Sequence, residues 1–294
     1  MSKIDRGLRM ISLIIPSMNK LYYTRRCLTS LLLTRGVDVE FVLVDNGSQD
    51  GTAEYLLEFR KVAAEKGIPV TIIINDRNVG ACTARNQAIG VARGSEVAFL
   101  DNDIVLRDKD WLLKLRETLY SSEDIALVTP KLLFPFPPYA IEHCSIAISP
   151  TGTVGYIGRG QLNDDPRYNQ RVDIQGSASA CVLVKKSVLD EVGIFDEIFN
   201  PVQFEDLDLF YRMKEKGYRL VYEPTAEMYH FENVTTDNSV TVNFKYQTIK
   251  NGVVFKKRWR HMFTVENGPA DEELRWAELP RQRIEEIGEL PIIE

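Results

Sequence analysis

Two carboxylates lie one residue apart in the segment Asp101-Asn102-Asp103, directly after the apolar run 97–100. Such a run predicts a buried strand, and open α/β sheets bind ligands at the carboxyl ends of their strands. Two acids held this close repel each other unless a cation lies between them, and divalent cations that carry diphosphates take oxygen ligands of this kind. Alternatively, the Asp and Asn residues end the strand in a turn, where they hydrogen-bond to their own backbone.

A second group of acids, Glu205, Asp206 and Asp208, stands at the start of a helix predicted over 207–216. The first turn of a helix favours negative charge by about 0.3–1 kcal/mol per residue, so the group could be purely structural. Three acids exceed what capping requires, however, and their mutual repulsion favours an elevated pKa for one of them. A carboxylate tuned in this way and facing a metal site would serve as a general base toward a hydroxyl.

Asp45 follows the apolar run 39–44 and precedes a loop that leads into a predicted helix. A carboxylate at that point can accept hydrogen bonds from a nucleobase or a ribose, as in other nucleotide-binding α/β folds. The alternative is that Ser48 or Asp50 simply caps the helix that follows, which is worth about 1 kcal/mol.

Arg85 and His230 are two further side chains that could take part in chemistry. Arg85 could pair with a diphosphate or with a carboxylate at the sheet rim, because its guanidinium fork suits both, or it could lie on a solvated helix face. His230 closes the apolar segment 226–229. An imidazole added to aspartate ligands would suit Mn²⁺, although a single histidine after a strand is often structural.

Alternating apolar runs and helical patterns must position these residues over the first part of the chain. The predicted strands are 10–15, 39–44, 70–74 and 97–100, and the predicted helices are 23–34, 52–66 and 81–92. Strands this apolar, separated by helices, indicate a parallel sheet covered on both faces. Crossovers between such strands are almost always right-handed, so we expect Asp45 and Asp101 to meet at the same rim of the sheet.

The pattern changes after about residue 121. We expect strands at 125–129, 179–184 and 219–222, irregular structure over 134–139, and a long surface loop over 149–170. The basic run 256–261 is interpreted as a solvated helix end, because cations favour helix C-termini. Alternatively, the aromatic residues within and beside it would let this run contact an anionic membrane surface or a lipid pyrophosphate.

The composition is that of an ordinary globular protein. The 294-residue chain is 44% hydrophobic and 27% charged, and its net charge of −6 does not favour a nucleic-acid partner. The four cysteines form no C-x-x-C pair, which favours reduced thiols over a disulfide framework or a zinc site. Residues 1–9 carry no apolar signal segment, and no apolar window is long enough to span a membrane. We therefore expect a cytoplasmic protein with at most peripheral contact with the inner membrane face.

Taken together, these segments resemble family 2 glycosyltransferases. The segments that carry the resemblance are, in order, Ile14-Ile15-Pro16-Ser17, 44–52 (VDNGSQDGT), Asn78-Val79-Gly80, Ala84-Arg85-Asn86, Asp101-Asn102-Asp103 and 204–209 (FEDLDL). Segments 193–197 (GIFDE) and Tyr229-His230 extend the resemblance to the rhamnosyltransferase-like bacterial branch. It covers roughly residues 10 to 235, and its specificity comes from the ordered co-occurrence of motifs that are individually weak.

The resemblance implies a GT-A fold, which is an α/β fold with a Rossmann-like, mostly parallel central sheet flanked by helices. It implies a single glycosyltransferase domain over residues 1–265, with a nucleotide-sugar half at about 1–121 and an acceptor half at about 122–265. Residues 266–294 are expected to form an acidic C-terminal appendage.

The resemblance also implies roles for individual residues. Asp103 and His230 would hold a divalent metal ion, Mn²⁺ or Mg²⁺, and Asp206 would be the catalytic base with Glu205 near the acceptor. The residues implied in nucleotide-sugar binding are Pro16, Asp45, Asn78, Arg85, Asp101 and Asn102. The middle position of the metal motif is Asn102 rather than a third acid, which leaves the metal preference open.

The implied reaction is a metal-dependent, inverting transfer of a sugar from a UDP, dTDP or GDP sugar to a hydroxyl of a glycan or lipid-linked acceptor, in bacterial glycan or polysaccharide assembly. Two other functions compete with it. A sugar-phosphate nucleotidyltransferase usually carries a glycine-rich phosphate loop after its first strand, whereas residues 16–20 (PSMNK) contain no glycine. A non-catalytic nucleotide-sugar binding or scaffold protein would not need the intact metal motif and the acidic group.

Overall fold

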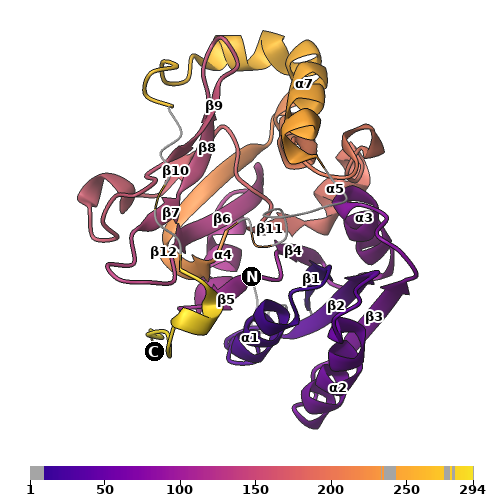
Figure 1. Ribbon diagram of the computed structural model, residues 1–294. Coiled ribbons are helices and arrows are strands. Elements are labelled where there is room, and N and C mark those ends of the chain that lie inside the picture. Colours follow the sequence, from indigo (N-terminus) through magenta and orange to yellow (C-terminus); the bar gives the residue numbers. More distant parts are fainter. Residues whose placement is uncertain (1–9, 233, 235–242, 275–278, 280–281, 294) are drawn as a thin grey trace.

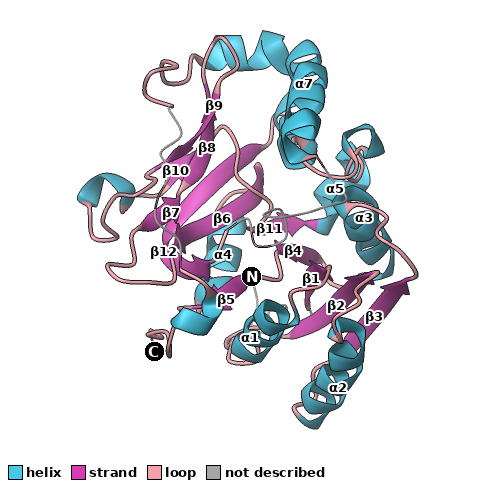
Figure 2. Ribbon diagram, viewed as in Figure 1, coloured by secondary structure: helices cyan, strands magenta, loops and turns pink. Residues whose placement is uncertain are grey.

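The computed structural model describes residues 10–232, 234, 243–274, 279 and 282–293. At its centre is a ten-stranded mixed sheet with helices on both faces (Figures 1 and 2). Along the sheet the strands follow the order β10-β12-β6-β11-β4-β1-β2-β3, with β5 beside β12 and β7 beside β6. The α/β fold predicted from the sequence is therefore confirmed.

The first part of the chain forms the all-parallel side of this sheet. Its strands are β1 (Ile11–Ser17), β2 (Val39–Asn46), β3 (Val70–Asn75) and β4 (Glu96–Leu100), joined by α1 (Leu21–Leu31), α2 (Thr52–Glu65) and α3 (Ala81–Val91). Each of these elements was predicted to within a few residues. Ser17 on β1 lies opposite Asp45 on β2, and Asp101 directly follows β4, so the predicted convergence at one rim is confirmed.

The second part of the chain adds the remaining helices and strands, which pair antiparallel except for the parallel pair of β6 with β12. Its strands are β5 (Ile104–Leu106), β6 (Ile125–Leu133), β7 (Ile141–His143), β8 (Ser145–Ile148), β9 (Val154–Ile157), β10 (Val172–Asp173), β11 (Cys181–Lys185) and β12 (Arg219–His230). Its helices are α4 (Trp111–Leu119), α5 (Lys186–Val192), α6 (Glu205–Glu215) and α7 (Phe244–Glu266), with short 3₁₀ turns η2 (Pro166–Tyr168), η3 (Glu197–Phe199) and η4 (Ile284–Glu286).

The sheet separates two hydrophobic cores, because successive side chains of a strand point to opposite faces. On β1, Ile14 packs into the core shared with α3, α5, α6 and α7, whereas Leu13 and Ile15 pack into the core shared with α1, α2 and α4. A third, smaller cluster contains Tyr229 of β12, Phe231 just after it, and Ile284 of the C-terminal segment. These layers fix the strand ends that carry the acidic residues.

Two predicted strands are shorter than the strands in the structure. The strand predicted at 219–222 continues as β12 through His230, and Pro224 lies where the pairing with β6 is interrupted between Glu223 and Glu227. Proline is tolerated at such bulges. The strand predicted at 125–129 likewise continues as β6 through Pro130 to Leu133. The correction matters because β12 delivers His230 to the sheet rim.

Two other predictions from the second part of the chain were wrong. The segment 149–170 is not a loop throughout, because β9 lies within it and pairs with β8 as a hairpin. The basic run 256–261 is not a helix end, because it lies inside α7, which continues to Glu266. Within that run Trp259 is buried and Arg258 forms ion pairs, so only part of it faces solvent.

Residues 282–293 lie against the body of the protein. Ile284 is buried, Tyr229 Oη donates to the Pro291 carbonyl at 3.0 Å, and Ile293 N donates to the Arg107 carbonyl at 2.6 Å.

The predicted boundaries at residues 121 and 265 stay predictions. The polar segment 1–9 and residues 275–278, 280–281 and 294 of the predicted appendage lie outside the described residues. Over the part of the chain that is described, no helix is both long enough and apolar enough to cross a bilayer.

The loop after β2 generates a first prediction. Gly47 has φ +80, and a Cβ added there would lie 2.6 Å from the backbone carbon of Arg77. Gly67 has a similar φ of +72, but a Cβ added there would have no neighbouring atom within 4 Å. We expect Gly67→Ala to cost about 1–2 kcal/mol of stability, from left-handed backbone strain alone. Gly47→Ala should cost at least about 2 kcal/mol more, because the Arg77 backbone must also move. Urea unfolding of both variants measures the difference, and equal costs would contradict this packing.

Candidate active site

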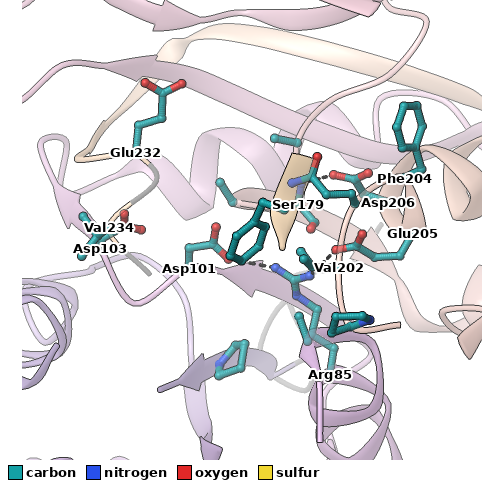
Figure 3. A pocket seen from close by; sticks show the side chains of 18 of the residues that line it. Arg85, Asp101, Asp103, Ser179, Val202, Phe204, Glu205, Asp206, Glu232 and Val234 are labelled. Carbon is teal, nitrogen blue, oxygen red and sulfur yellow. Dashed lines mark hydrogen bonds and ion pairs between the residues drawn. The ribbon is translucent and has the colours of Figure 1, made fainter. Parts of the chain in front are cut away.

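A cavity of about 660 Å³ opens at the rim where the strands of the first half end (Figure 3). Segments from both halves of the chain line it, including the ends of β1 and β4, the start of α6 and the end of β12. The residues predicted from the sequence that line this cavity are Pro16, Asn78, Arg85, Asp101, Asn102, Asp103, Glu205, Asp206 and His230. The structure therefore brings together nearly all of the predicted site in one place.

Asp101, Asp103 and His230 form a compact group on one side of the cavity. Each offers one ligand atom, and these atoms all lie within 4.8 Å of one another. His230 Nε2 is 3.4 Å from Asp103 Oδ1. The pairing of β12 with β5 causes this contact, because it sets His230 opposite Ile104, the residue after Asp103.

Glu142 holds the imidazole of His230 from behind. Its Oε2 lies 3.3 Å from His230 Nδ1, and its side chain is fully buried. Burial lowers the pKa of His230, but Asp103 and Glu142 outweigh burial and raise that pKa well above its usual value. A carboxylate that orients a histidine in this way is a common partner of metal-binding imidazoles. Sequence reasoning missed Glu142, because an acid inside a short strand carries no signal of its partner.

This donor set fits a hard divalent cation. Two carboxylates and one imidazole offer the oxygen and nitrogen ligands that suit Mn²⁺ and, with more water, Mg²⁺. Asp103 and His230 are both largely buried, whereas the Asp101 side chain is 36% exposed. A cation bound here would therefore face the cavity and could reach a ligand within it. The predicted role of Asp101 at the nucleotide or the metal fits this position.

Arg85 connects the two sides of the cavity. It projects from α3, and its side chain is only 6% exposed. Its Nη2 donates to Asp101 Oδ1 at 2.8 Å and its Nη1 donates to Glu205 Oε1 at 2.9 Å, as Figure 3 shows. Of the alternatives drawn from the sequence, the structure shows pairing with a rim carboxylate rather than a solvated helix face.

Glu205 and Asp206 begin α6 on the other side of the cavity. Asp206 is partly exposed, and its two oxygens accept from Ser179 N at 3.3 Å and Leu207 N at 2.7 Å. Burial raises the pKa of Asp206 above its usual value, despite these backbone donors and Arg85. Burial and repulsion from Asp206 raise the pKa of Glu205 to about 7, although Arg85 opposes the shift. The direction agrees with the elevation expected for an acid of this group, although burial rather than mutual repulsion is its main cause.

The loop that presents Glu205 and Asp206 is held by a residue that the sequence did not reveal. Asn251 on α7 is fully buried, and its Nδ2 donates to the carbonyls of Phe199 at 2.8 Å, Val202 at 3.0 Å and Gln203 at 2.9 Å. Gln247 Nε2 donates to Asn251 Oδ1 at 2.9 Å and fixes the amide's orientation. Gln203 and Phe204 have positive φ values of 84 and 70, so this clamp holds a strained segment in place.

Asp45 lies behind the cavity rather than on its lining. Its side chain is buried, its Oδ2 accepts from Ser48 N at 3.2 Å, and its Oδ1 has no partner among the described residues. Asp50 Oδ1 accepts from Thr52 N, in the first residue of α2, at 3.2 Å, although the N-cap position is Gly51 and has no side-chain cap. Because Asp45 Oδ1 is buried and Asp45 does not line the cavity, the predicted hydrogen bond from a base or ribose to Asp45 stays a prediction.

Asn78 and Asn102 shape the cavity wall through amide hydrogen bonds. Asn78 Oδ1 accepts from Asn46 Nδ2 at 2.9 Å and from Gly80 N at 2.8 Å, which fixes the turn into α3. Asn102 Nδ2 donates to Thr24 Oγ1 at 2.9 Å and is buried. Asn78 thus fixes backbone at the start of α3, and Asn102 is tied to the Thr24 side chain of α1.

Comparison with known proteins identifies relatives over most of the chain. Residues 12–192 match the sequence model of the family described as Glycosyl transferase family 2. The chain is 27% identical over 236 residues to the O-antigen biosynthesis protein RfbC of Myxococcus xanthus, covering 78% of this chain and 18% of that protein. It is 29% identical over 235 residues to the pre-mycofactocin glycosyltransferase of Mycobacterium tuberculosis H37Rv, covering 76% and 43%. The chain thus spans less than half the length of these relatives.

Two solved structures share the fold. GalNAc-T7, crystallised with UDP, GalNAc and Mn²⁺, aligns with a TM-score of 0.64 and 17% identity over 77% of this chain and 44% of that one. The mannosyltransferase PcManGT from Pyrobaculum calidifontis, in complex with GDP-Man and Mn²⁺, aligns with a TM-score of 0.55 and 15% identity over 87% and 73%. At this level of identity, the similarity shows a common GT-A-like α/β fold.

The elevated pKa of Glu205 predicts a pH dependence of stability. Between pH 4.5 and about 7 the unfolded chain releases this proton while the folded protein keeps it, so stability falls as pH rises through that window. Glu205→Gln removes the titration. We compare the unfolding free energy of Glu205→Gln with that of the unmodified protein at each pH. From pH 5 to pH 8 this difference should shift in favour of the variant by on the order of 2 kcal/mol.

Urea titrations at both pH values measure this change. Glu58→Gln is the matched control, because Glu58 lies on the exposed side of α2 and is solvated in both states. Its relative stability should stay the same at the two pH values. If the difference between Glu205→Gln and the unmodified protein were also the same at both pH values, the elevated pKa of Glu205 would be contradicted.

Proposed function

The chain belongs to glycosyl transferase family 2, and from this premise we propose that it transfers a sugar, with inversion, from a nucleoside-diphosphate sugar to a hydroxyl acceptor with the help of a divalent cation. The observation that carries the proposal is the shared cavity, which Asp101, Asp103 and His230 line together with Glu205 and Asp206. A cation-binding group and a carboxylate of raised pKa in one cavity supply the two functions that such a transfer needs.

The donor binds, in this proposal, along the rim formed by β1, β2 and β4. Pro16 lines the cavity and shapes the loop beside the nucleotide, whereas Asp45, whose unpaired Oδ1 is buried away from the cavity lining, supports the adjacent loop through Ser48 N. Asp103 and His230, with Asp101 beside them, hold Mn²⁺ or Mg²⁺, which when bound neutralises negative charge on the leaving diphosphate. Arg85 is engaged by Asp101 and Glu205, so it acts by holding these carboxylates in place rather than by direct contact with the diphosphate.

Asp206 is the proposed general base. It is the more exposed of the two acids at the start of α6, and its carboxylate lines the cavity. Asp206 takes the proton of the acceptor hydroxyl as that oxygen forms its bond to the anomeric carbon and the bond to the diphosphate oxygen breaks. Its raised pKa strengthens it as a base relative to a solvated aspartate. Glu205, more deeply buried, positions Arg85 and lies next to the acceptor side.

Relatives support a role in the assembly of cell-surface glycans without naming the substrates. One relative is described by its role in O-antigen biosynthesis, and another, from Bacillus subtilis, by a putative role in teichuronic acid biosynthesis. We place this chain among bacterial glycan-assembly transferases that use a UDP, dTDP or GDP sugar and a glycan or lipid-linked acceptor. The rhamnosyltransferase-like branch, suggested by 193–197 and Tyr229-His230, remains part of this proposal.

The rival functions make different demands on the same residues. A scaffold protein would bind a nucleotide sugar but would not need a base of raised pKa opposite the cation-binding group. A nucleotidyltransferase usually has a glycine-rich phosphate loop after its first strand, whereas residues 16–20, at the end of β1 and directly after it, contain no glycine. Both rivals are therefore less well supported than transfer.

Isosteric amide substitutions at Asp103 and Asp206 test these roles separately. Asp206→Asn should lower turnover by about 10²–10⁴-fold while leaving donor binding nearly intact, because it removes only the base. Asp103→Asn should lower turnover and also weaken Mn²⁺-dependent donor binding, because it removes a cation ligand. Thermal shifts with UDP, GDP and dTDP sugars, with and without Mn²⁺ or Mg²⁺, measure donor binding. Release of nucleoside diphosphate, with water in the acceptor's place, measures turnover.

Asp76→Asn, an exposed aspartate outside the cavity, is the matched control and should change neither quantity. Equal loss of donor affinity in the Asp103 and Asp206 variants would contradict the separate roles. Metal-dependent donor binding without any turnover in the unmodified protein would favour the scaffold function.

A further inference from the structure

Helix α7 has two faces of opposite character. Its inner face packs against the body of the protein through Phe255, Trp259 and Phe263, and Asn251 on the same face clamps the loop before Glu205. Its outer face is exposed along its length. Figure 1 shows α7 at the edge of the molecule, which leaves this face open to solvent.

The outer face carries an apolar stripe. Tyr246, Ile249 and Val253 are 64%, 62% and 64% exposed. Their spacing of three and four residues sets them on one line along the helix. Single exposed apolar residues are common, but three in register on one helix face form a surface that water solvates poorly.

Exposed cations surround this stripe. The exposed basic residues of α7 are Lys245, Lys250, Lys256, Lys257 and Arg260. At 3.6 residues per turn, Lys245 and Lys256 flank one side of the stripe, and Lys250 and Lys257 flank the other. The only acid in α7 is Glu266, which is engaged by Lys214 and by Tyr211 Oη at 2.7 Å.

The charge of α7 contrasts with that of the whole protein. Six of the 36 basic residues and one of the 42 acidic residues lie in α7, so the helix carries +5 and the rest of the chain −11. Basic residues are therefore enriched on a helix that also exposes an apolar stripe. The outer face of α7 thus combines positive charge with exposed apolar side chains, and it suits a partner that offers both negative charge and an apolar region.

We propose that the outer face of α7 binds an anionic lipid surface. Apolar side chains of such a helix enter the boundary between headgroups and acyl chains, while flanking lysines extend along it toward the phosphates. Nucleic acid would use the cations but would leave the apolar stripe in water. A second copy of this face would bring like charges together. Charge complementarity and the apolar stripe together favour the lipid surface.

The position of α7 links this surface to the cavity. Phe244 and Thr248, in the first turns of α7, line the active-site cavity, so the lipid surface would lie beside its mouth. The inference goes beyond the proposed function, because lipid binding requires neither a donor nor turnover. Where transfer does occur, this placement favours an acceptor carried on a lipid.

Vesicle flotation with the full chain tests the proposal. We expect binding to vesicles of mixed phosphatidylcholine and phosphatidylglycerol, little binding to phosphatidylcholine alone, and loss of binding in about 1 M salt, where charges are screened beyond about 3 Å. Lys250→Glu/Lys257→Glu should weaken binding at least about tenfold, since each basic residue near an anionic surface contributes about fivefold. Ile249→Ser/Val253→Ser should weaken it independently of charge.

Lys61→Glu/Lys66→Glu is the matched control, because it makes the same charge change at two exposed lysines at the far end of α2. This control should bind vesicles like the unmodified protein. Equal loss in the control, equal binding to neutral vesicles, no binding at all, or tighter binding to heparin than to anionic vesicles would each overturn the proposal. Thermal shifts with nucleotide sugars should be the same in the α7 variants and the unmodified protein. This measurement distinguishes a loss of lipid binding from a failure of the proposed sugar transfer.

Discussion

The buried guanidinium of Arg85 is the interaction on which the arrangement of the cavity depends. It bridges a carboxylate at the end of β4 and a carboxylate at the start of α6, which lie in different halves of the chain. A charge taken out of water is costly unless it is paired and hydrogen-bonded, and two nearby acids are costly unless a cation separates them. Arg85 meets both conditions at once. Without it, Asp101 and Glu205 would repel each other across the mouth of the cavity.

This constraint explains why the chemistry sits where the elements meet. The parallel strands of the first half deliver Asp101 and Asp103 to one rim, and β12, pairing with β5, returns His230 to the same point. On the other side, Asn251 and the start of α6 fix Glu205 and Asp206. The inner face of α7 therefore supports the proposed base, while its outer face is the proposed lipid-binding surface. One helix thus connects the two proposed activities through its two faces.

The elements of the first half were predicted well from the sequence. Its strands appear as short apolar runs, and its helices show apolar residues at helical spacing. The sequence also placed Asp45 and Asp101 at one rim, since parallel topology allows few alternatives. The second half was harder because the strands predicted at 125–129 and 219–222 continue through Pro130 and Pro224, and proline is unusual inside a strand. Glu142 and Asn251 could not be predicted at all. Their roles arise from contacts with residues 88 and about 50 positions away, which no local pattern records.

A double-mutant cycle between Arg85 and Glu205 tests the central role of this guanidinium most directly. Unfolding free energies at pH 8 would be measured for Arg85→Met, Glu205→Gln and the double variant, with the exposed pair Arg35–Asp110 as a reference cycle. We predict that Arg85→Met alone costs about 3–5 kcal/mol and that the second substitution restores a large part of it, because it removes the uncompensated buried carboxylate. The reference pair should couple by no more than about 1 kcal/mol. A coupling between Arg85 and Glu205 as small as that of the surface pair would contradict the account.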